Sequence, residues 1–287
     1  MVTPSFLAIG HVTRDLLADG YVLGGGATYA ALTALRLGQR PALLTRAEPA
    51  VAERLRAALA GVAVLCLPSP RTTTFHNDYG ANGREQRLLA VAEPLGPADL
   101  PPEWRAASVV LLAPVAGDVP GELVDCFPDS LLGLAAQGWL RRRSADGVVR
   151  PAPWQGGEAA LSRADLVVFS EEDVAGNETL VARYAAQTRL LALTQGARGV
   201  TLYHHGRPVQ VPAFPAAEVD PTGAGDVFCA AFLIAYQAGR EPLAAARYAN
   251  CAASFAVEQQ GTAGIPSRAQ VAARLRAATD KSRREAD

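Results

Sequence analysis

Short apolar runs alternate along the chain with longer segments whose apolar residues recur at helical spacing. The runs show little internal alternation, which is typical of strands that are covered on both faces. Such runs predict strands at residues 5–10, 41–45, 62–67, 108–114, 130–136, 164–170 and 189–196. Helical spacing predicts helices at residues 27–38, 47–61, 223–239, 241–259 and 267–278. Strands that alternate with helices indicate a mainly parallel α/β sheet.

Two segments interrupt this alternation and predict β-hairpins. Residues 71–89 are rich in threonine and aromatic residues and contain Asn82-Gly83, so we expect a turn near residues 81–83. Residues 199–211 predict a second hairpin, with His205-Gly206 at its turn. A hairpin inserted among strand–helix units often covers a site as a flap. The alternative for the first hairpin is a plain sheet edge without a role.

The charge balance narrows the classes of function. The chain has 287 residues, a formal net charge of −1 and a single lysine, Lys281, close to its end. Near-neutral charge argues against a nucleic-acid or anionic-membrane partner. Without a suitable lysine, the chain has no P-loop, no protein-kinase lysine and no buried Schiff base. Any phosphate chemistry must therefore use arginine, backbone N–H groups and helix dipoles.

Cysteine usage and hydropathy indicate a cytoplasmic protein. Cys66, Cys126, Cys229 and Cys251 are widely spaced and form no Cys-x-x-Cys pair, which is typical of unpaired thiols in a reducing compartment. The first residues do not resemble a signal peptide. No apolar run reaches 18 residues, so we expect no membrane association.

The segment Asp220–Asp226 carries the strongest chemical signal. It reads Asp-Pro-Thr-Gly-Ala-Gly-Asp and leads directly into an apolar helix. A helix N-terminus offers unpaired N–H groups and a positive dipole end, and glycines let a ligand approach the backbone. This combination predicts an anion hole for a phosphoryl group, with Asp226 placed to accept a proton from an attacking hydroxyl. The alternative is a plain helix cap formed by Thr222 or Asp226.

Further motifs lie before and after this segment. They are Gly10 with Asp15, Gly24-Gly25 ahead of Ala-Leu-Arg-Leu-Gly, Ser170–Asp173, Thr194–Gly199 and Asn250. Together with Asp220–Phe228, and from Ile9 to about Pro266, these motifs and their order resemble the ribokinase-like, or phosphofructokinase-B, family of small-molecule kinases. Residues 71–77 resemble the inositol-kinase-like branch of that family, which hints at a polyol such as myo-inositol.

The resemblance implies a fold and a reaction. The expected fold is a three-layer α/β/α sandwich with a mainly parallel central sheet, formed by residues 1–287 as a single domain. A small β lid would come from about residues 12–23, as a short strand, and residues 71–91. The expected reaction is transfer of the γ-phosphoryl group of ATP to a hydroxyl of a small sugar, cyclitol or nucleoside, with Mg²⁺.

The resemblance also implies a role for each matching residue. Asp226 is the expected general base, and the N–H groups of Gly223, Ala224 and Gly225 are the expected anion hole. The expected substrate contacts are Asp15, Gly24, Gly25, Tyr29, Gln137 and Arg141. The expected nucleotide contacts are Ser170, Thr194, Gly196, Arg198, Gly199, Gly225 and Asn250. Asp173 is the expected metal-linked carboxylate, and Asp220 and Thr222 are candidates for holding a monovalent cation such as K⁺.

Three positions depart from the family pattern and keep alternatives open. Tyr29 stands where many members place an asparagine that contacts the sugar, so helix packing is an equal alternative for it. Ser170 and Asp173 replace an Asn-x-x-Glu motif, and Glu172 is an alternative carboxylate. Gln137 and Arg141 touch a polar or anionic substrate, or belong to a solvated basic loop with Trp139 packed below.

Two other classes of function compete with the kinase. A catalytically silent ligand-binding protein on the same fold would explain the altered Ser170 and Tyr29. A dinucleotide-dependent oxidoreductase is disfavoured because no Gly-x-Gly-x-x-Gly follows the first strand. Both a monomer and a homodimer are compatible with the sequence.

Overall fold

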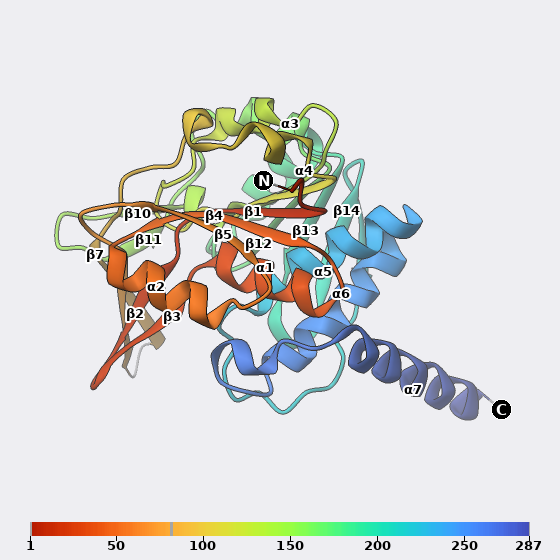
Figure 1. Ribbon diagram of the computed structural model, residues 1–287. Coiled ribbons are helices and arrows are strands. Elements are labelled where there is room, and N and C mark those ends of the chain that lie inside the picture. The colour runs from red at the N-terminus through yellow and green to blue at the C-terminus, as the bar shows by residue number, and fades with distance from the viewer. Residues whose placement is uncertain (1, 81–82, 287) are drawn as a thin grey trace.

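The computed structural model describes residues 2–80 and 83–286, and its centre is one large twisted sheet (Figure 1). The sheet has nine strands in the order β15-β14-β13-β12-β9-β8-β1-β4-β5. Its parallel strands are β1 (Phe6–Ile9), β4 (Pro41–Ala47), β5 (Ala63–Pro68), β8 (Val109–Leu112), β9 (Leu131–Ala135), β12 (Leu166–Ser170) and β13 (Leu190–Thr194). Each matches an apolar run of the sequence, so the predicted α/β class is confirmed.

The second predicted hairpin adds the two antiparallel edge strands, β14 (Val200–His204) and β15 (Arg207–Val211). Its turn contains His205 and Gly206, both at positive φ. Glycine reaches this conformation without steric cost, which is why such a pair ends a hairpin.

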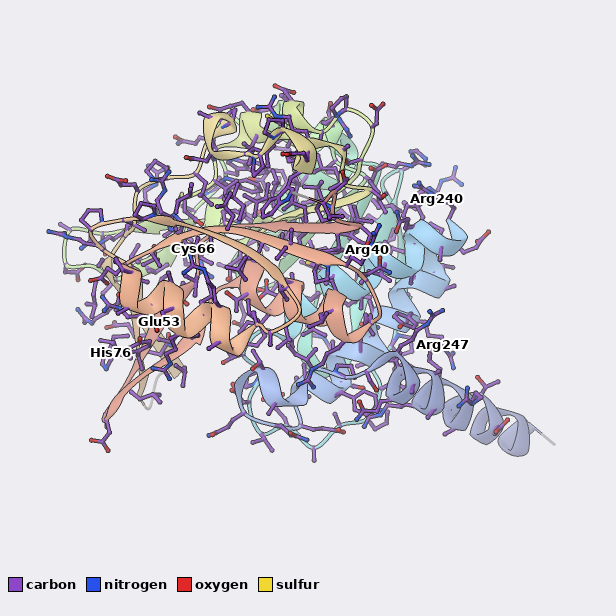
Figure 2. All side chains as sticks on the ribbon, in the orientation of Figure 1. Arg40, Glu53, Cys66, His76, Arg240 and Arg247 are labelled. Carbon is purple, nitrogen blue, oxygen red and sulfur yellow. The ribbon has the colours of Figure 1, made fainter. Side chains whose placement is uncertain are left out.

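Helices cover both faces of the sheet because both faces are apolar. Along β1, Phe6 and Ala8 face one hydrophobic cluster while Leu7 and Ile9 face the other. One face is covered by α1 (Gly26–Arg36), α2 (Pro49–Ala58), α5 (Ala224–Gly239) and α6 (Pro242–Ala256). The other is covered by α3 (Glu158–Arg163), α4 (Glu178–Gln187) and several 3-10 turns. Charged side chains such as Arg40, Glu53, Arg240 and Arg247 lie on the outside (Figure 2).

The strand order reverses beside β1. The chain runs from β1 to β4 on one side, whereas β8 lies on the other side of β1. In open parallel sheets, ligands bind at the carboxyl ends of the strands where such a reversal opens a crevice. The topology therefore places the expected site beyond the ends of β1 and β8.

A second sheet of four strands, in the order β3-β2-β6-β7, forms the predicted lid. Its strands are β2 (Thr13–Leu17), β3 (Gly20–Gly24), β6 (Thr73–Gly80) and β7 (Gly83–Ala90). The expectation of one short strand within residues 12–23 is wrong: residues 13–24 form an antiparallel hairpin with a turn at Gly20. The other predicted turn falls partly on Ala81 and Asn82, which lie outside the described residues.

One buried imidazole joins the chain segments at the root of the lid. His11 lies between β1 and β2; its Nδ1 is 2.7 Å from Thr73 Oγ1, and its Nε2 is 2.9 Å from the carbonyl oxygen of Glu93. The backbone N–H of His11 donates to Asp118, and the Ala92 N–H donates to Thr73 Oγ1. Burial lowers the pKa of His11, so the ring stays neutral at pH 7. The lid is thus fixed to the main sheet by fully paired polar groups.

The hydrophobic pattern missed helices α3 and α4 and a short pair of strands. Helix α4 buries Leu180, Val181 and Tyr184, whose spacing is helical and could have predicted it. The short antiparallel pair β10 (Arg141–Arg143) and β11 (Val149–Pro151) replaces the expected basic loop. Three consecutive arginines give no apolar signal, so this pair had no detectable pattern. Helix α7 (Arg268–Ala286) ends the chain, and no helix among residues 2–80 and 83–286 is long and apolar enough to cross a membrane.

Candidate active site

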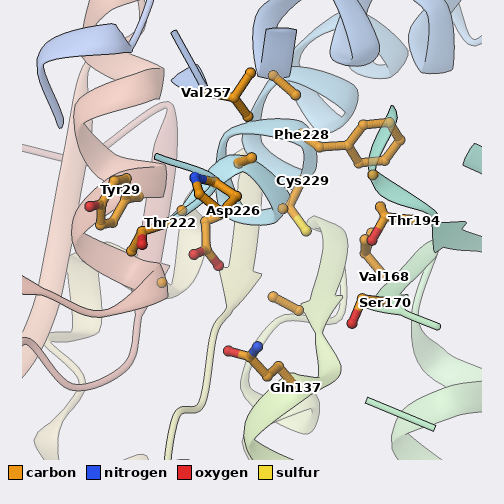
Figure 3. Close-up of a pocket in the computed structure, with 18 of the residues that line it drawn as sticks. Tyr29, Gln137, Val168, Ser170, Thr194, Thr222, Asp226, Phe228, Cys229 and Val257 are labelled. Carbon is orange, nitrogen blue, oxygen red and sulfur yellow. The ribbon is translucent and has the colours of Figure 1, made fainter. Parts of the chain in front are cut away.

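The start of α5 carries Asp226 into a large cavity. Gly223 is the N-cap with φ 79°, no side chain caps the helix, and Asp226 lies in its first turn. Figure 3 shows the Asp226 carboxylate projecting from the helix into the cavity, with Tyr29 on one side and Ser170 and Thr194 on the other. The predicted glycine-lined helix start therefore exists and opens onto a ligand-sized space.

The carboxylate of Asp226 also meets the start of a second helix. A Cβ atom at Gly26, the first residue of α1, would lie 2.4 Å from Asp226 Oδ1. Only glycine leaves room for the carboxylate at this point. The N-cap of α1 is Gly25, again without a side-chain cap. Two positive helix ends thus converge on one carboxylate, an arrangement that favours negative charge between them.

Tyr29 supports the α5 start. A Cβ atom at Gly223 would lie 2.3 Å from its ring, whereas its hydroxyl oxygen lies on the Gly261 side. In Figure 3 that hydroxyl points away from Asp226. Burial, with three neighbouring aspartates, raises the pKa of the phenol, so it stays protonated. The ring lines the cavity, but packing beneath the predicted anion hole is the contact the structure gives it.

One N–H group of the predicted anion hole, that of Ala224, already donates a hydrogen bond within the protein. The Ala224 N–H donates to the carbonyl oxygen of Pro221 at 3.2 Å, a long bond that a phosphoryl oxygen would have to displace or share. The Asp226 N–H donates to Gly223 O at 3.0 Å, which tightens the first turn.

The predicted acceptor contacts come from the lid, from α1 and from the end of β9. Asp15 on β2 accepts a hydrogen bond from Thr13 Oγ1 at 2.9 Å, and a Cβ at Gly24 would lie 2.3 Å from its Oδ2. Gly24 thus makes room for Asp15 and does not itself line the cavity. Gln137, on the 3-10 helix Ala136–Trp139, and Arg141 approach from the opposite wall.

Ser170 and Asp173 are hydrogen-bonded to each other at the end of β12. Asp173 Oδ2 accepts from both the N–H and the hydroxyl of Ser170 at 2.8 Å, and the Asp173 N–H donates back to Ser170 Oγ at 3.2 Å. The shorter pair that replaces Asn-x-x-Glu is therefore internally satisfied. Its carboxylate stays on the cavity wall, together with that of Glu172.

The predicted nucleotide contacts line the far end of the cavity, with one exception. Thr194, Gly196, Gly199 and Asn250 lie on its wall. The Asn250 amide donates to the carbonyl oxygens of Val211 and Pro212, both at 3.0 Å, so it also fixes the strand exit there. Arg198 instead projects outward and pairs with Glu171.

Asp220 lies behind the cavity. Its Oδ1 accepts from the Thr222 N–H and its Oδ2 from the Gly261 N–H, both at 2.9 Å. Asp220 thereby joins the anion-hole loop to the turn after α6. A monovalent-cation role for Asp220 and Thr222 stays a prediction.

The cavity has a volume of about 790 Å³ and connects both groups of residues. Sequence reasoning did not single out several of its lining residues: Thr13, Gly26, Phe75, Gln86, Phe214 and Glu218. Phe75 and Gln86 come from the lid hairpin. Phe75 lies within residues 71–77, which carry the inositol-kinase-like resemblance, whereas the only sequence signal for Gln86 was the hairpin itself.

Electrostatics prepare Asp226 for proton transfer. Burial raises the pKa of its carboxyl to about 7; Arg141 opposes this shift and Asp173 adds to it. An acid–base group with a pKa near 7 is suited to accept a proton at neutral pH.

No group of three or more metal-ligating side chains occurs within the described part of the chain. Mg²⁺ is commonly held by one or two carboxylates together with substrate phosphates and water. Asp173 and Glu172, both on the cavity wall, fit that requirement.

Comparisons with known proteins agree with this geometry. A family model described as pfkB family carbohydrate kinase matches residues 132–268. Inositol 3-kinase of Zea mays is 29% identical over an alignment that covers 89% of this chain and 72% of that enzyme. Ribokinase of Bacillus subtilis (strain 168) is 44% identical over 82 residues, 28% of each chain. A sulfate complex of a pyrophosphate-dependent kinase in the ribokinase family superposes with a TM-score of 0.78 at 25% identity, covering 93% of this chain and 99% of that one.

Proposed function

Because the chain belongs to the pfkB family of carbohydrate kinases, we propose that it transfers the γ-phosphoryl group of ATP to one hydroxyl of a small polyhydroxylated molecule. The observation that carries this proposal is the half-buried Asp226 carboxylate, held between two uncapped helix starts inside the cavity. A carboxylate in the first turn of α5 is placed to accept a proton from an attacking hydroxyl.

The proposed mechanism assigns each step to residues of the chain. Asp226 accepts the proton of the substrate hydroxyl as its oxygen attacks the γ-phosphorus, and the bond from that phosphorus to the β–γ bridging oxygen breaks to release ADP. The N–H groups of residues 223–225 and the dipole of α5 stabilise the charge on the phosphoryl oxygens. The lid covers the acceptor and excludes water, which competes as a phosphoryl acceptor. Mg²⁺, held by Asp173 or Glu172, would neutralise phosphate charge.

The far wall of the cavity favours ATP as the donor. It presents Ala197, Phe214, Ala253 and Val257, an apolar surface suited to a planar base. Pyrophosphate would leave this surface without a contact. Pyrophosphate is the second candidate donor, because a structural relative at 25% identity is described as a pyrophosphate-dependent kinase.

The near wall favours a polyol as the acceptor. Asp15, Gln86 and Gln137 offer carboxylate and amide groups that can each bond a hydroxyl. One relative that aligns over 89% of this chain is an inositol 3-kinase. We therefore propose a cyclitol such as myo-inositol as the first substrate to test, ahead of a sugar or a nucleoside.

A donor-by-acceptor panel tests the proposal. Purified protein with Mg²⁺ is given ATP or pyrophosphate together with myo-inositol, ribose, fructose or a nucleoside, and phosphorylated product is measured by ³¹P NMR. We expect product with ATP and a cyclitol. Product only with pyrophosphate would overturn the donor assignment. No product from any pair, with ATP still bound, would favour the catalytically silent binding protein.

A further inference from the structure

The cavity is rich in carboxylates and poor in cations. Its wall carries the acidic side chains of Asp15, Glu172, Asp173, Glu218 and Asp226. Among the side chains that the structure describes on this wall, Arg141 is the single cationic one. A phosphoryl group in transit spreads negative charge over three oxygens, and this charge needs positive partners.

Arg141 reaches between the two halves of the cavity. Its Nη1 donates to Oε1 of Gln86, on lid strand β7, at 3.0 Å, and its Nη2 lies 3.6 Å from Asp173 Oδ1. Its side chain is only 15% exposed. Its charge also lowers the pKa of Asp226, with which it shares the cavity wall. The guanidinium thus joins the lid to the carboxylate that is proposed to hold the metal.

The backbone that carries Arg141 is firmly anchored. Trp139 stacks on Trp154 with ring centroids 4.2 Å apart, and its Nε1 donates to Val119 O at 2.7 Å. Leu140 is buried, and its carbonyl oxygen accepts from the Ala152 N–H at 2.8 Å. A Cβ atom at Gly138 would lie 2.3 Å from the Pro114 backbone, so this segment lies directly on the sheet end. The backbone that positions the guanidinium is therefore held firmly in place.

A salt bridge to Asp173 does not by itself explain why Arg141 lies on the cavity wall. Asp173 already accepts two hydrogen bonds from Ser170 on Oδ2, and the Arg141 contact at 3.6 Å is too long for the bidentate pairing that arginine forms with a structural partner. The planar guanidinium carries five donors in a fixed fork, a geometry that matches phosphate oxygens.

Building on the proposed kinase function, we propose that Arg141 is a catalytic residue whose guanidinium contacts the phosphoryl group during transfer. Gln86 is a positioning residue that orients this guanidinium from the lid. Its amide cannot be reversed, because Arg141 only donates and the Gln86 Nε2 donates to Asn77 Oδ1 at 3.0 Å. Lid geometry and placement of the catalytic charge are thereby coupled through one hydrogen bond.

Kinetics of matched arginine variants test the catalytic role. We expect Arg141→Gln to lower kcat about 10²–10³-fold, as for loss of a transition-state donor. Arg141→Lys should recover part of that loss, because lysine keeps the charge but not the planar fork. The control is Arg142→Gln on the same strand, whose side chain is exposed and points to the opposite face. Equal kcat for Arg141→Gln and Arg142→Gln would overturn the proposal.

A binding measurement separates this proposal from the kinase assignment. Aluminium fluoride with ADP mimics the phosphoryl group in transit, so it should tighten ADP binding to the native protein. We expect Arg141→Gln to lose this tightening while plain ADP affinity stays within about twofold; retained tightening would overturn the proposal. If no acceptor is phosphorylated, the kinase assignment fails, and this measurement still supports or overturns the contact between Arg141 and the phosphoryl position.

The role of Gln86 is tested by a matched pair. Gln86→Leu removes the acceptor for Arg141 and should lower kcat about tenfold, with fluoride-dependent tightening reduced. Gln86→Glu keeps an acceptor oxygen and should restore most of both. A Gln86→Leu variant with native kcat and native tightening would refute the positioning role.

Discussion

The two halves of the cavity that we propose for the donor and for the acceptor are built differently, one from backbone groups and one from side chains. The donor half uses backbone: glycines at helix starts and strand ends, N–H groups, and the uncapped start of α5. The acceptor half uses side chains from three separate elements, with Asp15 on β2, Gln86 on β7 and Arg141 on β10. Backbone sites need small residues in sequence order, so they produce motifs, whereas side-chain sites do not.

The same contrast separates α5 from α4. The start of α4 is closed by Asn177, whose side chain accepts from the Leu180 N–H at 3.0 Å. The start of α5 has Gly223 in the same position and no side-chain cap. A capped helix start satisfies its own N–H groups, whereas a start with a glycine cap offers them to a ligand. The start of α5 also lines the cavity, so its N–H groups face a ligand-sized space, which those of α4 do not.

Removing the carboxylate where the two halves meet should have the largest effect. Asp226→Asn keeps the shape of the side chain but cannot accept the proton, so we expect kcat to fall at least 10³-fold with ATP affinity nearly unchanged. Steady-state turnover measures kcat, and titration with ATP measures the affinity. Near-native turnover would refute Asp226 as the base.

Asp226→Asn should also change stability, with a definite sign. Because burial raises the folded-state pKa to about 7, the native state holds a proton that the unfolded state releases, and stability from this group falls as pH rises from about 4 to 7. We therefore expect the variant to melt above the native protein at pH 8 and equal to it at pH 4. A lower melting temperature at pH 8 would contradict the buried-charge assignment.

Glycine variants along α5 should distinguish backbone strain from blocked binding. Gly223→Ala forces an L-residue into φ 79° and against the Tyr29 ring, so we expect it to lower both melting temperature and kcat, the latter about 10²-fold. A Cβ at Gly225 contacts nothing within 4 Å, so Gly225→Ala should lower kcat by blocking the cavity while the melting temperature stays constant.

Gly239→Ala, at the other end of α5, is the control for these variants. Its Cβ also contacts nothing within 4 Å, and it lies outside the cavity. Turnover should be native for this variant. Loss of turnover there, equal to that of Gly223→Ala, would show that general perturbation of α5 explains the effect.

The pH profile should sharpen the assignment of the base. Asp226 must be ionised to accept a proton, so kcat/KM should rise about tenfold per pH unit below about 7 and level off above it. Initial rates between pH 5.5 and 9 measure this profile. A flat profile across pH 6–8 would exclude Asp226 as the titrating base in the free enzyme.

The smallest expected effects are changes in KM for only one of the two substrates, depending on which half of the cavity is altered. Phe214→Ala removes apolar surface from the donor wall and should raise KM for ATP several-fold with little change in KM for the acceptor. Asp15→Asn should do the reverse. Both KM values are measured for each variant. Equal changes in both values for either variant would show that the halves do not act separately.

Much of the fold was readable because its physics is local. Apolar runs such as Val109–Leu112 are buried on both faces, and α1 and α5 both have glycine N-caps, so periodicity and helix-start signals coincide with the structure. Elements without such signals were missed. Strand β10 consists of three arginines, and the hairpin β2–β3 was expected as a single strand because it is short and half exposed.

By itself, the sequence determined the parallel sheet and the glycine-lined helix start with its carboxylate, because these depend on neighbouring residues and on backbone conformation. Only the tertiary structure decided that Gly26 makes room for Asp226, that the Tyr29 ring packs beneath Gly223, and that Gln86 of the lid holds Arg141. Each of these contacts joins residues at least 55 positions apart in the chain. Such pairs meet through the packing of whole elements, and packing leaves no periodic pattern in the sequence of either partner.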